Sequence, residues 1–230
     1  MSWKEPVDLM PQLRTRDVFV VFVGTVALVL ALYVSWNFAG PQWKTPIGAL
    51  AYECGLVLVV AIGVGVLGFS RGHFDWAAIG FRRCSIDWIV RALLIVPLLL
   101  ALASVIAALT KLVDVLFFVF PEDQIVLDAH STALTTGLAF VVIVLTPIAQ
   151  EALLRGVLFA WARRYLNFWI AACGCSIIFG MVHIGIERPG TVVIFSVISA
   201  ALYEKTRSLW PSIAMHVALS SAYFFAVLSP

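Results

Sequence analysis

The sequence predicts an all-α membrane protein: a polytopic bundle of about seven transmembrane helices with its N-terminus in the cytosol. Of its 230 residues, 62% are hydrophobic and only 12% are charged, whereas soluble domains are about 45–50% apolar and about 25% charged. The charged residues gather between long uncharged stretches, and most of these stretches can cross a ~30 Å hydrocarbon layer. The basic residues also fall unevenly along the chain. These observations together predict a multi-pass protein, which we expect in a bacterial plasma membrane.

Seven stretches are expected to span the membrane, although the sixth is short for this purpose. Two prolines are expected to bend their helices, Pro97 in the third span and Pro147 in the fourth, while Pro211 falls near a first turn, where proline is tolerated. The expected spans are residues 17–38, 47–69, 88–109, 133–162, 168–186, 191–203 and 209–226.

This division places eleven basic residues on the N-terminal side of the membrane, when Arg91 in the first turn of the third span is counted there, and three on the other side; Arg155 lies deeper inside a span. Lys and Arg prefer cytosolic loops, so the N-terminus is expected inside and the C-terminus outside. Residues 74–81 are expected to form a short amphipathic helix on the membrane surface, and residues 111–132 a segment too short to span. We expect two parts: residues 1–132 with three spans, and a four-helix core at residues 133–230.

No run of basic residues suits nucleic-acid binding, so the bilayer is the expected partner besides a substrate. Four cysteines are present, and none has the two-residue spacing of a zinc knuckle or redox pair. Nothing in the sequence indicates an oligomeric state.

The fourth span carries an acid and a base in very apolar surroundings. Glu151 and Arg155 are four residues apart, so they share a face of a helix, and Gln150 precedes them. Ionisable groups cost roughly 2.5–3.5 kcal/mol each at the centre of a membrane helix and commonly mark a functional site. The sequence therefore predicts a site on this helix.

Two further polar pairs have the same spacing. Phe179 and His183 lie in the fifth span, and His216 and Ser220 lie in the seventh. Polar groups in lipid need partners inside the protein, so we expect the three helices to turn these faces toward one cavity.

A carboxylate and an imidazole on opposing helices can activate a water molecule. A second histidine with a hydrogen-bond donor one turn away can stabilise the oxyanion of a tetrahedral intermediate. Arg155 could pair with Glu151 or orient a carboxylate of the substrate.

The motifs resemble those of the CPBP family, the CAAX-protease and bacteriocin-processing (Abi) intramembrane glutamic endopeptidases. The pattern of that family is Glu-Glu-x-x-x-Arg, then Phe-x-x-x-His, then His-x-x-x-Asn or Asp, on separate membrane helices. Residues 150–155 resemble the first motif with one departure, residues 179–183 match the second, and residues 216–220 resemble the third. The resemblance covers roughly residues 133–228.

The resemblance implies metal-independent hydrolysis of a peptide bond in a membrane-embedded or lipid-modified substrate. Position 150 and His183 would activate the water, and His216 with position 220 would bind the oxyanion. Arg155 and Phe179 would support them.

Two positions depart from the family pattern, Gln150 and Ser220. An amide cannot act as a general base, so the chain is expected to be slow or inactive in this mechanism. Gln150 could be an engineered replacement of a glutamate, or a natural residue with Glu151 acting as the base, or a sign of a natural pseudo-protease. Ser220 is a milder change, because a hydroxyl can still donate to an oxyanion.

Three other interpretations remain open at this point. A non-cleaving relative could bind a membrane peptide or partner in an immunity or chaperone role. Glu151, His183 and His216 could hold zinc with an open fourth position, although the family resemblance implies no cofactor. The same groups could also line a proton or ion pathway.

Overall fold

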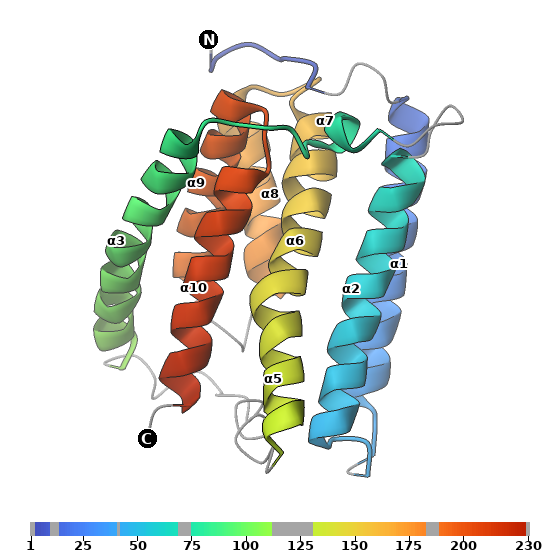
Figure 1. Cartoon of the computed structure of the whole chain (residues 1–230). Helices are drawn as coiled ribbons and strands as arrows, with labels where there is room; N and C mark the ends of the chain where they lie inside the picture. The colour runs from blue at the N-terminus through green and yellow to red at the C-terminus, as the bar shows by residue number, and fades with distance from the viewer. Residues whose placement is uncertain are drawn as a thin grey trace.

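The computed structural model describes residues 3–9, 14–40, 42–68, 75–111, 131–182 and 189–228. All regular structure in these ranges is helical, which confirms the predicted all-α class. The helices run side by side along one bundle axis (Figure 1). Their bounds are α1 Thr15–Asn37, α2 Pro46–Gly68, η1 Trp76–Ile79, α3 Ile86–Lys111, α5 Thr132–Phe140, η2 Val141–Leu145, α6 Thr146–Glu151, η3 Ala152–Phe159, α7 Ala160–Ala162, α8 Phe168–Val182, α9 Pro189–Thr206 and α10 Trp210–Leu228.

Four of these helices are long and apolar enough to cross a membrane. They are α1, α2, α3 as far as Ile106, and the continuous helix from Thr132 to Ala162 that comprises α5, η2, α6, η3 and α7. We call this continuous helix the central helix. The prediction of a polytopic helical membrane protein is therefore confirmed.

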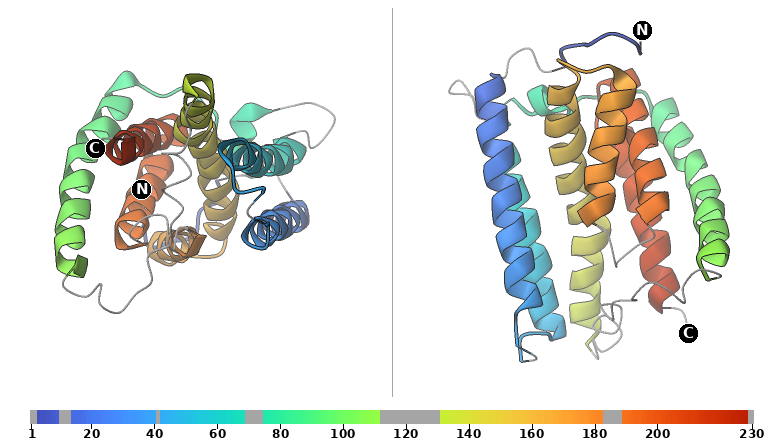
Figure 2. Two further views of the ribbon diagram at one scale, coloured as in Figure 1. Left: turned by 90° about the horizontal axis from the view of Figure 1, so that it is seen from below. Right: turned by 180° about the vertical axis from the view of Figure 1, so that it is seen from behind.

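The helices at the expected fifth and sixth spans are shorter than α1, although α9 is longer than the expected stretch 191–203. Helix α8 has 15 residues and α9 has 18, against 23 in α1, and the apolar part of α8 is Phe168–Gly180. Figure 2 shows that α8 and α9 extend less far than α1, α2 and α5 toward the end of the bundle opposite the N-terminus. If the central helix counts as one and the short turn η1 is left out, the described part of the chain has seven helices. Four of them are long apolar spans.

The central helix lies between the other helices and contacts α1, α2, α8, α9 and α10. Helix α1 packs on the outer side of α2, and α3 packs on α9 and α10 at the opposite flank (Figure 2). Pro147, which has no N–H to donate to the preceding turn, follows the π-helical turn η2 directly. A second π-helical stretch, η3, begins just after Glu151, and such stretches are frequent at functional sites.

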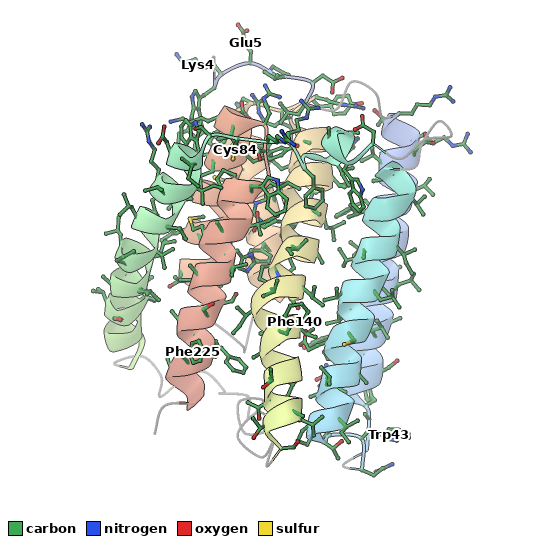
Figure 3. All side chains as sticks on the ribbon, viewed as in Figure 1. Lys4, Glu5, Trp43, Cys84, Phe140 and Phe225 are labelled. Atoms are coloured by element: carbon green, nitrogen blue, oxygen red, sulfur yellow. The ribbon has the colours of Figure 1, made fainter. Side chains whose placement is uncertain are left out.

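Residues 3–9 lie across one end of the bundle, which we call the N-terminal end. The Trp3 ring packs edge-on against Phe168 with centroids 4.0 Å apart, and Val7 N–H donates to the Arg163 carbonyl at 2.7 Å. Figure 3 places Lys4 and Glu5 at the end of the bundle opposite to Trp43, which lies in the α1–α2 turn. Residues 3–9 therefore pack on the bundle.

Residues 75–85, which precede α3, also lie at this end, and the helix among them is shorter than the one predicted over residues 74–81. Instead of an amphipathic surface helix, the structure has one short 3₁₀ turn, η1, capped by the Asp75 carboxylate. Ile79 is completely buried. Gly80, with φ of 100°, turns the chain so that its carbonyl accepts from Leu209 N–H at 2.9 Å.

The expected interfacial segment at residues 111–132 lies almost entirely outside the described residues. The division of the chain near residue 132 stays a prediction. Helix α2 contacts α5 and α6, and α3 contacts α9 and α10, so the first three spans pack closely on the expected core.

Gly156 in η3 offers a test of the contact between residues 75–85 and the central helix. A Cβ at this position would overlap with the Ile79 carbonyl oxygen, and forcing extra atoms into a packed site costs about 1–3 kcal/mol. We expect Gly156→Ala to lower the thermal midpoint of the purified protein in detergent. The matched control is Gly174→Ala in α8, where an added Cβ meets nothing within 4 Å; an equal loss there would contradict the close approach at Gly156.

Candidate functional site

The carboxylate of Glu151, the last residue of α6, is completely buried at the centre of the bundle. Ser199 Oγ on α9 lies 2.6 Å from Oε2 and donates to it. His216 Nδ1 on α10 lies 3.1 Å from Oε1. A carboxylate has no hydrogen to give, so Nδ1 carries the hydrogen of this bond. Glu151 thus joins three helices through one side chain.

Arg155 lies on the same side of the central helix as Glu151, as its spacing predicts. Its Nη1 is 3.1 Å from Oε1 of Glu151, but this nitrogen has no well-aligned hydrogen bond. The pair is therefore held mainly by opposite charge. Nη2 of Arg155 donates to both the carbonyl and the hydroxyl oxygen of Ser196, each at 2.9 Å.

Aromatic rings enclose this charged group. The Arg155 guanidinium lies 5.5 Å from the Phe179 ring centroid and 5.8 Å from that of Phe195, within the range of cation–π attraction. The His216 ring lies 4.7 Å from Phe195 and 5.9 Å from Phe179. Residues from the three predicted motif helices therefore meet, with Phe179, Arg155, Glu151 and His216 in one cluster.

Ser220 lies one turn beyond His216 on α10 and is half-buried. The sequence could not distinguish it from Ser221, because both are serines. The structure does: the hydroxyl of Ser221 donates to the Val217 carbonyl of its own helix at 2.7 Å. Ser220 therefore remains the better candidate for a donor near His216.

Of the predicted water-activating pair, the structure describes Gln150 but not His183. Gln150 is half-buried beside Glu151 on α6, while His183 lies outside the described residues, one position beyond the end of α8 at Val182. The assignment of Gln150, Glu151, His183, His216 and Ser220 as reacting residues thus stays a prediction.

The sequence missed Ser196 and Ser199, which line the site from α9. The expected sixth span carried no motif, yet its two serines contact Arg155 and Glu151 directly. The available signal was weak: two hydroxyl residues three positions apart, and so on one helix face, in a helix that is otherwise mostly apolar.

Among the described residues, no group of three His, Cys, Asp or Glu side chains could hold a metal ion. The zinc alternative named Glu151, His183 and His216, and only Glu151 and His216 are described. These two face each other directly at 3.1 Å.

A second buried ion pair lies nearer the N-terminal end of the bundle. Arg163 and Glu204 are joined by two hydrogen bonds of 2.7 Å, one from Nε and one from Nη2, and both side chains are almost fully buried. Arg163 Nη1 donates to the carbonyls of Glu5 and Leu166. The sequence placed Arg163 among the basic residues of an inside loop, but the structure uses it to connect α9 with residues 3–9.

Comparison with known proteins gives a family match over the region that forms the site. Residues 132–222 match the family described as type II CAAX prenyl endopeptidase Rce1-like. The putative membrane peptidase YdiL of Bacillus subtilis (strain 168) is 27% identical over 84 residues, which are 36% of this chain and 34% of YdiL. The match thus spans about a third of the length of this curated relative. No solved structure matches the chain.

The Arg163–Glu204 pair generates a stability prediction. Replacing Glu204 by Gln keeps the shape but leaves the buried guanidinium without its counter-charge, which costs about 3–5 kcal/mol. We expect Glu204→Gln to lower the unfolding free energy in detergent by that order. The matched control is Asp8→Asn, because Asp8 forms a more exposed pair with Arg164 at 2.8 Å and such pairs contribute at most about 1 kcal/mol. Equal effects of the two changes would contradict the structural role of Arg163.

Proposed function

We propose, for a chain that carries a domain of the Rce1-like type II CAAX prenyl endopeptidase family at residues 132–222, that its core is an intramembrane endopeptidase site. The substrate class is a membrane-embedded or lipid-modified peptide. The name of the family and the description of YdiL as a putative membrane peptidase support this class. The site would hydrolyse one peptide bond of such a substrate.

One observation carries the proposal: the Glu151 carboxylate holds His216 while Arg155, its neighbour on the central helix, lies against Phe179. These residues come from all three family-like motifs and from three different helices. A shared buried cluster is what the motifs require if they serve a single site. A set of unrelated packing contacts would not need to bring them together.

In the proposed reaction, a base at position 150 with His183 removes a proton from water as its oxygen attacks the peptide carbonyl. The proton then passes to the leaving amine as the C–N bond breaks. His216 and Ser220 donate to the oxyanion. Since Nδ1 of His216 is bound to Glu151, the donor must be Nε2–H, which requires the doubly protonated ring.

Glu151 is better suited to this supporting role than to the role of the base. Oε2 accepts from Ser199 and Oε1 lies against both Arg155 and His216. A general base needs a lone pair directed at the water, and each oxygen of Glu151 already faces a donor. Gln150 therefore leaves the chain slow in cleavage unless the amide is replaced.

A second candidate function follows from Gln150. With Gln150 in place of a carboxylate and Ser220 in place of an amide or acid, the site could bind a membrane peptide without cutting it. This is the immunity or chaperone role considered from the sequence, and it uses the same cluster for recognition alone.

The proposed orientation places the N-terminal end of the bundle in the cytosol, with seven crossings of a bacterial plasma membrane. Eleven of the basic residues are expected at that end, which agrees with the preference of Lys and Arg for the cytosol. Glu151 lies roughly 15 Å along the helix from Ala162, at about 1.5 Å per residue. The site would therefore be nearer to the cytosolic interface.

The proposal is tested by restoring the missing carboxylate. We expect Gln150→Glu to raise cleavage of a membrane peptide about 10²–10⁴-fold, the usual contribution of a general base. The double variant Gln150→Glu/Ser220→Asn keeps the test decisive if the oxyanion donor is also limiting. Suitable probes are a farnesylated CAAX peptide and a single-span peptide without a lipid, both reconstituted in liposomes and analysed by mass spectrometry.

Adding His183→Ala to the active variant should abolish its cleavage, and EDTA should not affect it. Cleavage that needs zinc and is indifferent to Gln150→Glu would instead support the metal alternative. Binding of the probes without cleavage by either variant would support the non-cleaving function. Flux of protons across proteoliposomes that depends on His216 would indicate the pathway alternative.

A further inference from the structure

Ser199 on α9 contacts Glu151, and none of the three sequence motifs predicted this contact. Its hydroxyl is completely buried and donates to Oε2 at 2.6 Å, the shortest of the three contacts that the carboxylate makes with described residues. Oε1 is shared by Arg155 Nη1 and His216 Nδ1, both at 3.1 Å. The two oxygens of Glu151 therefore have different partners.

Removal of the Ser199 hydroxyl would leave Oε2 without this donor. The carboxylate could then turn toward Nη1 of Arg155, which lies 3.1 Å from Oε1 and has no well-aligned hydrogen bond with a described residue. Nη2 would stay bound to Ser196. The contact that would be lost in this rotation is the one to His216.

The contacts also form a closed ring between α9 and α10. Ser199 binds Glu151 through its hydroxyl, and Glu151 binds His216. One turn before His216, the hydroxyl of Ser212 donates to the carbonyl oxygen of Ser199 at 3.1 Å. Ser199 is thus connected to α10, the helix that carries His216, in two ways: its side chain through Glu151 and its backbone carbonyl through Ser212.

We propose that Ser199 is a positioning residue: it fixes the rotation of the Glu151 carboxylate so that Oε1 holds His216 by Nδ1–H and leaves Nε2 for the substrate. This inference rests on the proposed function for its effect on catalysis. Its effect on the histidine, however, exists whether or not the chain cleaves anything. The two can therefore be measured separately.

The kinetic test uses Gln150→Glu as the background. We expect Ser199→Ala to lower kcat about 10- to 100-fold with little change in KM, since a hydrogen bond to a charged group is lost. Ser199→Thr keeps the hydroxyl and should recover most of the rate. The matched control is Ser176→Ala on α8: Ser176 is equally buried, and its hydroxyl has no partner. Its rate should stay within about twofold.

The second test records the ring nitrogens of His216 by NMR of ¹⁵N-histidine-labelled protein in detergent, assigned with a His216→Asn variant. In the chain with Gln150, the His216 signals should show hydrogen on Nδ1, with or without a second hydrogen on Nε2. Ser199→Ala should lower the share of rings that carry hydrogen on Nδ1, whereas Ser176→Ala and Ser199→Thr should not.

Unchanged ring-nitrogen signals in Ser199→Ala would overturn the proposal, whatever happens to kcat. So would a shift of these signals without a fall in kcat in an active background. If no variant at position 150 cleaves, the proposed function fails, and the NMR result alone decides whether Ser199 positions Glu151 and His216.

Discussion

A carboxylate buried among membrane helices must be matched by donors and positive charge, and the arrangement of the core follows from this requirement at Glu151. An isolated charge at the centre of a bilayer is costly, and no water is at hand to hydrogen-bond a group buried there. The chain meets the requirement with Arg155 from the same helix, Ser199 from α9 and His216 from α10. Because each donor comes from a fixed position, the carboxylate sets the rotation and depth of three helices relative to one another.

The second buried pair gives the bundle another fixed point. Arg163 and Glu204 connect the end of the central helix to the end of α9, and Arg163 also binds residues 3–9. Helix α9 is therefore held at two levels, by Ser196 and Ser199 at the site and by Glu204 near its end. Breaking one partner of a buried pair is more costly than the pair is favourable. These two sets of contacts therefore fix the position of α9 more than they add to the free energy of unfolding.

How much the sequence predicts depends on the kind of signal. The long apolar helices follow from composition alone, and the Glu151–Arg155 pair follows from helical spacing, because both are local properties. Ser199 could not be predicted, since its role comes from a partner 48 residues away and serine is common in helix contacts. The packing of Ile79 against Gly156 was missed for a related reason: the apolar residues at 76–79 suit a membrane surface and a protein surface equally. The shortness of α9, in contrast, was visible in the sequence, where the sixth stretch is short for a membrane span.

Gln150 and Glu151 are neighbours in sequence but lie in different surroundings. Successive side chains on a helix point roughly 100° apart, so Gln150 points in a different direction from Glu151, which contacts Ser199 and His216. Glu151 is completely buried while Gln150 is only half-buried, which agrees with this division. A change of acid to amide at position 150 therefore leaves the contacts of Glu151 untouched. The fold and the histidine geometry can persist in a chain with little cleavage activity, and the family match over residues 132–222 is compatible with either a peptidase or a peptide-binding protein.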